Sequence, residues 1–150
     1  MKPQAILVSA CLLGLPTRYD GRAKHNQKAL DYLRQCGMIP VPVCPEQLAG
    51  LATPRPMTFF ACGDGTDVLD GSGNLINENR IEMSRLFIQG ATRTLEIARL
   101  AGCQQALFKD GSPSCGVHRI CRNGARVAGK GVTSALLQRS GLRVFSEEDL

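Results

Sequence analysis

The sequence predicts an α/β protein, in which a mostly parallel sheet is flanked by helices as in Rossmann-like and flavodoxin-like domains. One observation leads to this fold class, and a second to the number of domains. Short apolar runs typical of strands alternate along the chain with segments of helical periodicity. The length of 150 residues is close to the usual size of one domain. We therefore expect residues 1–150 to form a single domain.

The first strand and the first helix are predicted near the N-terminus. An apolar run at 5–9 is typical of a buried strand. A helix is expected at 26–36, because Asn26 is a good N-cap and Gly37 is a common stop after a helix.

A second strand and an insert follow. The apolar run at 38–43 predicts a strand, and its two prolines place it at a sheet edge, because proline cannot donate a hydrogen bond to a neighbouring strand. A long glycine-rich insert occupies 45–77. Within it, 58–60 and 67–69 are expected to pair as a small hairpin.

The second half of the chain contains the clearest helical pattern. Apolar residues at spacings of three and four predict a helix over 78–101 that packs one face on the core, and these residues are Met83, Phe87, Ala91, Leu95 and Ala98. A strand at 106–108, a helix at 133–139 and a strand at 143–145 complete the predicted elements.

Composition limits the possible partners and location. The net charge of +5 comes from scattered Lys and Arg residues, and aromatic residues make up only 5% of the chain, which disfavours a nucleic-acid partner. Neither a signal peptide nor an apolar stretch of spanning length is present, so we expect a cytoplasmic protein without a membrane partner.

The chain contains seven cysteines, an odd number for a disulfide framework. In a reducing compartment, metal binding or catalysis is the more common use of cysteine. The spacing includes no C-x-x-C pair, which disfavours a zinc ribbon and a redox dithiol.

Three of these cysteines, Cys11, Cys44 and Cys115, each follow a predicted strand by a few residues. Ligands of open α/β sheets bind outside the carboxyl ends of the strands, so the three thiols are expected to meet in one site. Such a site suits a soft metal centre or an iron–sulfur cluster with one iron not bound by protein, and three merely buried thiols are equally compatible with the spacing. The other four, Cys36, Cys62, Cys103 and Cys121, are expected to be small apolar filler.

Several sequence blocks carry a family resemblance over nearly the whole chain. The blocks are SACLLG at 9–14, RYDG at 18–21, PVCPEQ at 42–47, TPR at 53–55 and SPSCG at 112–116. They resemble the signatures of the thiouracil desulfurase family. The resemblance implies a [4Fe-4S] cluster held by Cys11, Cys44 and Cys115, whose fourth iron takes the sulfur of a thiolated nucleobase.

The resemblance also implies an activity, the hydrolytic and non-redox conversion of 2-thiouracil, or a related thiolated pyrimidine, to uracil and sulfide. Glu46, two residues after Cys44, is expected to activate the water. Ser112 is expected to contact the substrate or relay a proton, and Ser114 to shape the turn or touch the substrate, with the order of these two roles open.

Two more residues are candidate substrate contacts. Tyr19 could stack on a base and Arg18 could meet an anionic group. Equally, Arg18 and Asp20 could pair with each other and only hold the loop.

Two other classes of protein stay open at this point. One is a non-enzymatic iron–sulfur protein that carries or senses sulfide. The other is a zinc-containing or cluster-free α/β domain, in which the cysteines pack or act as nucleophiles.

Overall fold

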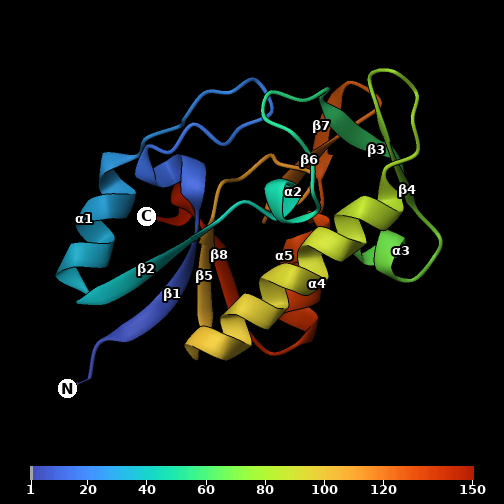
Figure 1. Cartoon of the computed structure of the whole chain (residues 1–150). Helices are drawn as coiled ribbons and strands as arrows, with labels where there is room; N and C mark the ends of the chain where they lie inside the picture. The colour runs from blue at the N-terminus through green and yellow to red at the C-terminus, as the bar shows by residue number, and fades with distance from the viewer. Residues whose placement is uncertain (1) are drawn as a thin grey trace.

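A computed structural model describes residues 2–150 (Figure 1). The elements, in chain order, are β1 (Gln4–Ser9), the 3-10 helix η1 (Ala10–Leu13), α1 (Gln27–Gln35), β2 (Met38–Val43), α2 (Pro45–Leu48), β3 (Thr58–Cys62), α3 (Gly65–Leu69), β4 (Asn74–Asn77), α4 (Ser84–Ala101), β5 (Gln105–Phe108), β6 (Arg119–Arg122), β7 (Ala125–Ala128), α5 (Val132–Arg139), β8 (Arg143–Ser146) and the 3-10 helix η2 (Glu147–Asp149).

The first sheet has the strand order β2-β1-β5-β8, and all of its neighbouring strands are parallel. Numbered along the chain, this order begins like that of flavodoxin-like folds, with the second strand outside the first. The prediction of a mostly parallel sheet is confirmed. The prediction that 38–43 lies at a sheet edge is also confirmed, because β2 is the outer strand next to β1.

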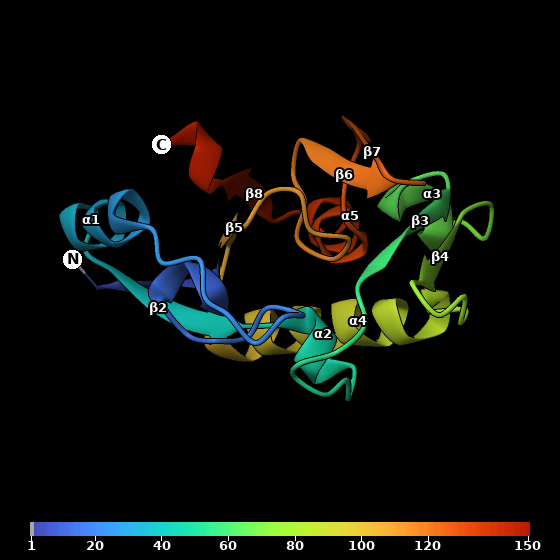
Figure 2. The same cartoon turned by 90° about the horizontal axis from the view of Figure 1, so that it is seen from above.

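Helices cover both faces of this sheet. The side chains of β1 alternate between the two faces, so both faces are apolar and each packs against different helices. Ile6 and Val8 pack in one cluster with Leu33 of α1. Leu7 points to the other face, where it shares a cluster with Leu95 of α4 and Leu137 of α5. Figure 2 shows α1 on one side of the sheet and α4 on the other. The flanking helices predicted from the sequence are therefore present.

A second sheet has the strand order β4-β3-β6-β7, with β3 antiparallel to β4 and parallel to β6. The predicted partner of 58–60 is wrong, because β3 pairs with β4 and 67–69 lies in α3. The reason is local: Asp64 and Asp67 form a capping box that starts a helix at this point.

Strands β6 and β7 were not predicted. They form an antiparallel hairpin joined by Asn123 and Gly124, which have φ angles of 50° and 83°. Asn-Gly is a strong signal for a tight hairpin turn. The flanking strands have only four residues each, so their apolar pattern is weak.

The long helix begins later than its periodicity predicts, at Ser84 rather than at 78. Between β4 and α4 the chain turns back on itself, and Ile76 forms an isolated bridge with Glu82. The side chain of Asn77 accepts hydrogen bonds from the backbone N–H groups of Asn79 and Ile81, and so stabilises this turn.

Helix α4 spans both sheets (Figures 1 and 2). Its first half contributes Phe87 and Ala91 to the cluster under the second sheet, and its second half contributes Leu95 and Ala98 to the cluster under the first. Within residues 2–150, neither α4 nor any other helix is long and apolar enough to cross a membrane.

Candidate active site

A cavity of about 420 Å³ lies where the carboxyl ends of the first sheet face the second sheet. Cys11 in η1, Cys44 after β2 and Cys115 in the loop after β5 line one part of it. Thr58 of β3 and Ile120 of β6 line another part. The parallel order of the first sheet thus brings together three cysteines that are far apart in the sequence.

The three thiols are shielded from water, and this determines their protonation. Burial raises the pKa of Cys11 to about 11, although the charges of Arg18 and Lys109 lower it. Burial also raises the pKa of Cys44 and of Cys115. A charge on Cys44 would raise the pKa of Cys11 and Cys115 further, so the three thiols are neutral near pH 7 unless cations bind to them.

The arrangement fits a polyatomic metal group better than a single ion. Among residues 2–150, no three Cys, His, Asp or Glu side chains lie close enough together to bind one metal ion. A tetrahedral zinc site needs its donors around one centre, whereas an iron–sulfur cluster takes thiolates that lie around a larger volume. Three soft sulfur donors around one cavity therefore suit an iron–sulfur cluster.

The remaining cysteines behave differently from one another, and all seven are free thiols. Cys103 is buried, as expected for apolar filler. For Cys36 and Cys62 that prediction is wrong, because both are exposed, one at the end of α1 and the other at the end of β3. Cys121 is half-buried and lines the cavity.

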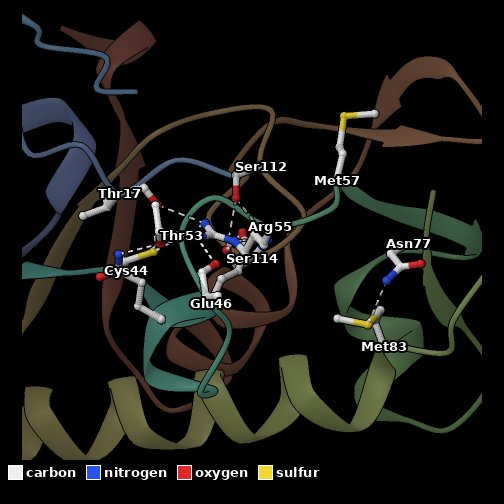
Figure 3. Close-up of polar contacts among 12 residues, drawn as sticks. Thr17, Cys44, Glu46, Thr53, Arg55, Met57, Asn77, Met83, Ser112 and Ser114 are labelled. Atoms are coloured by element: carbon white, nitrogen blue, oxygen red, sulfur yellow. Dashed lines mark hydrogen bonds and ion pairs between the residues drawn. The ribbon is translucent and has the colours of Figure 1, made fainter. Parts of the chain in front are cut away.

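Glu46 enters the cavity from the first turn of α2, whose N-cap is Cys44 and whose first residue is Pro45. Its carboxylate has a different partner at each oxygen. Oε1 accepts a hydrogen bond from Arg55 Nε at 3.0 Å, and Oε2 accepts one from Ser114 Oγ at 3.1 Å. Figure 3 shows these side chains meeting.

The two serines before Cys115 have separate contacts. Ser112 Oγ accepts hydrogen bonds from the backbone N–H groups of Ser114 and Cys115, at 3.2 and 3.1 Å, so it shapes the turn. Ser114 Oγ lies 3.1 Å from Ser112 Oγ and 3.8 Å from Cys115 Sγ. Of the two, Ser114 is the one that bonds to Glu46.

Arg55 is a site residue whose role the sequence does not predict. Its side chain is only 5% exposed, and its guanidinium reaches Glu46, Cys44 Sγ and the backbone oxygen of Thr17. The available signal was its place in the TPR block at 53–55. A single arginine in a loop has no periodicity that reveals burial.

Arg18 and Tyr19 both line the cavity. The guanidinium carbon of Arg18 lies 5.8 Å from the centre of the Tyr19 ring, within range of a cation–π contact. Asp20 instead accepts a hydrogen bond from the backbone of Arg22. Across residues 2–150 no ion pair joins Arg18 to Asp20, so that alternative is wrong.

The loop that carries Cys115 is held from inside by Asp110, which is 2% exposed. Burial alone would raise the pKa of Asp110, but hydrogen bonds from the backbone of His118, Val117, Arg119 and Gly111 lower it below its usual value. The carboxylate stays ionised and ties both ends of the loop together.

The same loop is held from outside by η2, at the end of β8. Glu147 forms an ion pair with Lys109 Nζ at 2.9 Å and accepts a hydrogen bond from the backbone N–H of Asp110 at 2.7 Å. The next two acidic residues pair with Arg119 and His118, respectively. The fourth strand of the first sheet thus also supports the site.

Comparison with known proteins agrees with this geometry. The family model described as 2-thiouracil desulfurase matches residues 6–149. The chain is 35% identical over 148 residues to the uncharacterized protein YbbK of Bacillus subtilis (strain 168), a match that covers 97% of each chain. It is also similar to the solved structure of TudS, a [4Fe-4S]-dependent thiouracil desulfidase, with a TM-score of 0.83 and 40% identity over 99% of this chain and 93% of that one. The chain therefore belongs to the 2-thiouracil desulfurase family.

Proposed function

We propose that this protein is a thiouracil desulfurase, which converts 2-thiouracil or a related thiolated pyrimidine to uracil and sulfide. The observation that carries the proposal is the cavity in which three thiols lie beside the Glu46 carboxylate. Family membership supports it. In the net reaction the oxygen of water replaces the sulfur, the C=S bond becomes C=O, and hydrogen sulfide leaves without a change of electron count.

Cys11, Cys44 and Cys115 are the proposed ligands of a [4Fe-4S] cluster. Their thiols lose protons on binding, which offsets the raised pKa values that burial causes. When bound through three thiolates, such a cluster supplies one iron without a protein ligand, a thiophilic Lewis acid for the sulfur of the substrate.

Glu46 is the proposed general base. Glu46 lines the cavity, and its Oε2, which accepts a hydrogen bond from Ser114, takes a proton from the attacking water. The Ser114 hydroxyl continues the hydrogen-bond chain from Glu46 and provides a path for that proton toward the pyrimidine ring, while Ser112 Oγ, 3.1 Å from Ser114 Oγ, holds the turn.

Arg18 and Tyr19 are the proposed substrate contacts. Tyr19 offers the face of its ring to the pyrimidine, and Arg18, held over that ring, offers hydrogen-bond donors to a substrate oxygen. A sulfide carrier or sensor would need the cluster alone. The Glu46 and Ser114 pair beside the thiols favours an enzyme instead.

The proposal is tested with protein purified without oxygen, whose iron and acid-labile sulfide are measured before 2-thiouracil is added. Cys11→Ala, Cys44→Ala and Cys115→Ala should each lose the cluster and the activity. Cys103→Ala is the matched control, because Cys103 is also buried but does not line the cavity, and it should keep both.

Glu46→Gln should keep the cluster but lower kcat by a factor of about 100 or more, the usual effect of losing a general base. Full turnover by this variant would refute the role of Glu46. If protein with a complete cluster forms no uracil from 2-thiouracil or from a 4-thiouracil derivative, the proposed activity itself is refuted and a carrier or sensor remains.

A further inference from the structure

We infer that Arg55 is a positioning residue for this reaction, which holds the Glu46 carboxylate in one orientation relative to the Cys44 sulfur. The inference rests on the proposed function, in which Glu46 activates water. It concerns how that carboxylate is kept in place.

Every nitrogen of the Arg55 guanidinium has an acceptor. Nε donates to Glu46 Oε1 at 3.0 Å, and Nη1 donates to Thr53 Oγ1 at 2.9 Å. Nη2 donates to the backbone oxygen of Thr17 at 3.0 Å and lies 3.8 Å from Cys44 Sγ. These groups surround the guanidinium in Figure 3. A buried cation without hydrogen-bond partners is very unfavourable. Any other orientation of the Arg55 side chain would leave some of its N–H groups without acceptors, so these bonds hold the guanidinium in one orientation.

The contact with Arg55 makes the two oxygens of Glu46 inequivalent. Oε1 accepts from Arg55 and Oε2 accepts from Ser114, and Glu46 itself lines the cavity. The planar guanidinium fixes this direction, because its donors lie in a rigid fork. A lysine at 55 would keep the charge but could not bond to Glu46, Thr53 and Thr17 together.

The acceptors of Arg55 come from separate parts of the site. Thr17 lies in the loop after η1, which carries Cys11, and its carbonyl also accepts from Cys44 Sγ at 3.6 Å. Glu46 belongs to α2, and Thr53 to the loop before β3. Arg55 therefore links the segment that follows β1 to the start of α2, where the carboxylate has to be placed.

The test compares Arg55→Ala and Arg55→Lys with Arg122→Ala. Arg122 is a matched control, because it is also partly buried and donates to a backbone oxygen, that of Gly63, away from the cavity lining. Both Arg55 variants should keep their iron and acid-labile sulfide and lose about 100-fold in kcat, the scale expected for a misplaced catalytic group. KM should change much less, and the control should match wild type.

Three further readouts separate positioning from a general structural role. Added guanidinium ion should restore part of the kcat of Arg55→Ala, which leaves space for it, but not that of Arg55→Lys. In the Glu46→Gln background, Arg55→Ala should cost little additional activity, because residues that act as one unit are not additive. Thermal unfolding of wild type, Glu46→Gln, Arg55→Ala and the double variant should show non-additive losses of stability for this pair, independently of turnover.

Three results would overturn the inference. They are unchanged kcat in Arg55→Ala, additive losses in the double variant, and loss of the cluster in both Arg55 variants, which would mean that Arg55 assembles the thiols instead. If wild-type protein with a full cluster forms no uracil, the proposed function is what fails. Active wild type beside a fully active Arg55→Ala refutes the role of Arg55 alone.

Discussion

Ser112 and Ser114 lie on either side of Pro113, yet their hydroxyl groups have different partners. Ser112 Oγ accepts backbone hydrogen bonds within the turn, whereas Ser114 Oγ donates to Glu46. Side-chain types alone did not separate the two roles. The contacts do, because a hydroxyl that already accepts two backbone N–H groups is held by the turn.

These contacts predict opposite profiles for the two alanine variants. Ser112→Ala leaves two backbone N–H groups without their acceptor and should lower the free energy of unfolding by about 1–3 kcal/mol. Ser114→Ala removes the donor to Glu46 Oε2 and should lower kcat by about tenfold or more, with a smaller loss of stability. Thermal unfolding and steady-state kinetics on both variants check this. A stable, fully active Ser114→Ala would contradict it.

At the scale of elements, the seating of α2 on α4 explains a glycine in the middle of the long helix. A glycine inside a helix costs about 1 kcal/mol relative to alanine, so it needs a packing reason. A Cβ atom at Gly90 would lie 2.2 Å from the backbone oxygen of Pro45 and 3.3 Å from Ala49 Cβ. Only glycine lets α2, and with it Cys44 and Glu46, lie this close to α4.

Gly90→Ala should therefore destabilise the protein despite the better helix propensity of alanine. We expect a loss of about 1–3 kcal/mol, typical of overpacking, together with a lower kcat because α2 is displaced. Thr92→Ala is the control, because Thr92 is exposed on the same helix and the change should leave stability and kcat near the wild-type values. Chemical unfolding and kinetics measure both. A Gly90→Ala variant more stable than wild type would contradict this, because it would show that α2 moves away from α4 at little cost in free energy.

At the scale of the whole molecule, α4 ties the two sheets together, and we propose that residues 1–150 fold as one domain. Phe87 packs under the second sheet and Leu95 under the first. The core under each of the two sheets thus contains side chains of the same helix. A chain built in this way should unfold in one cooperative transition.

Phe87→Ala and Leu95→Ala test this proposal from opposite halves. Each should lower the free energy of unfolding by about 2–5 kcal/mol, the usual cost of a large-to-small core substitution. Each should also shift the whole transition, when circular dichroism and hydrogen exchange of peptides from both sheets are followed in denaturant. Two separate transitions, each moved by only one variant, would show two independent units.

The chain sequence was sufficient to predict the parallel half of the fold. Strands β1, β2, β5 and β8 are apolar runs bounded by turn residues, and α1 has its Asn26 N-cap, whose side chain accepts from Ala29 N. These are local signals, readable within one element. Because parallel strands end at the same sheet edge, they also predicted that Cys11, Cys44 and Cys115 meet.

The second sheet could not be predicted from such local signals. Its strands have four or five residues and pair across long loops, as β3 does with β6. Local patterns therefore do not define the partner of 58–60, and the pairing with 67–69 that they suggest is wrong. One local signal, the Asn123-Gly124 turn, was present and could have predicted the β6–β7 hairpin.

The environment of the candidate active site came from the tertiary structure alone. Ser114 reaches Glu46 across 68 positions of the chain, and Arg55 reaches Thr17 across 38. Periodicity and capping describe neighbours along the chain, whereas these hydrogen bonds depend on how the loops lie over the strand ends. The sequence thus specified which thiols and which carboxylate gather at the sheet edge. Folding specified the hydrogen-bond partners of that carboxylate, because the orientation and the burial of its side chain are set only when distant segments pack together.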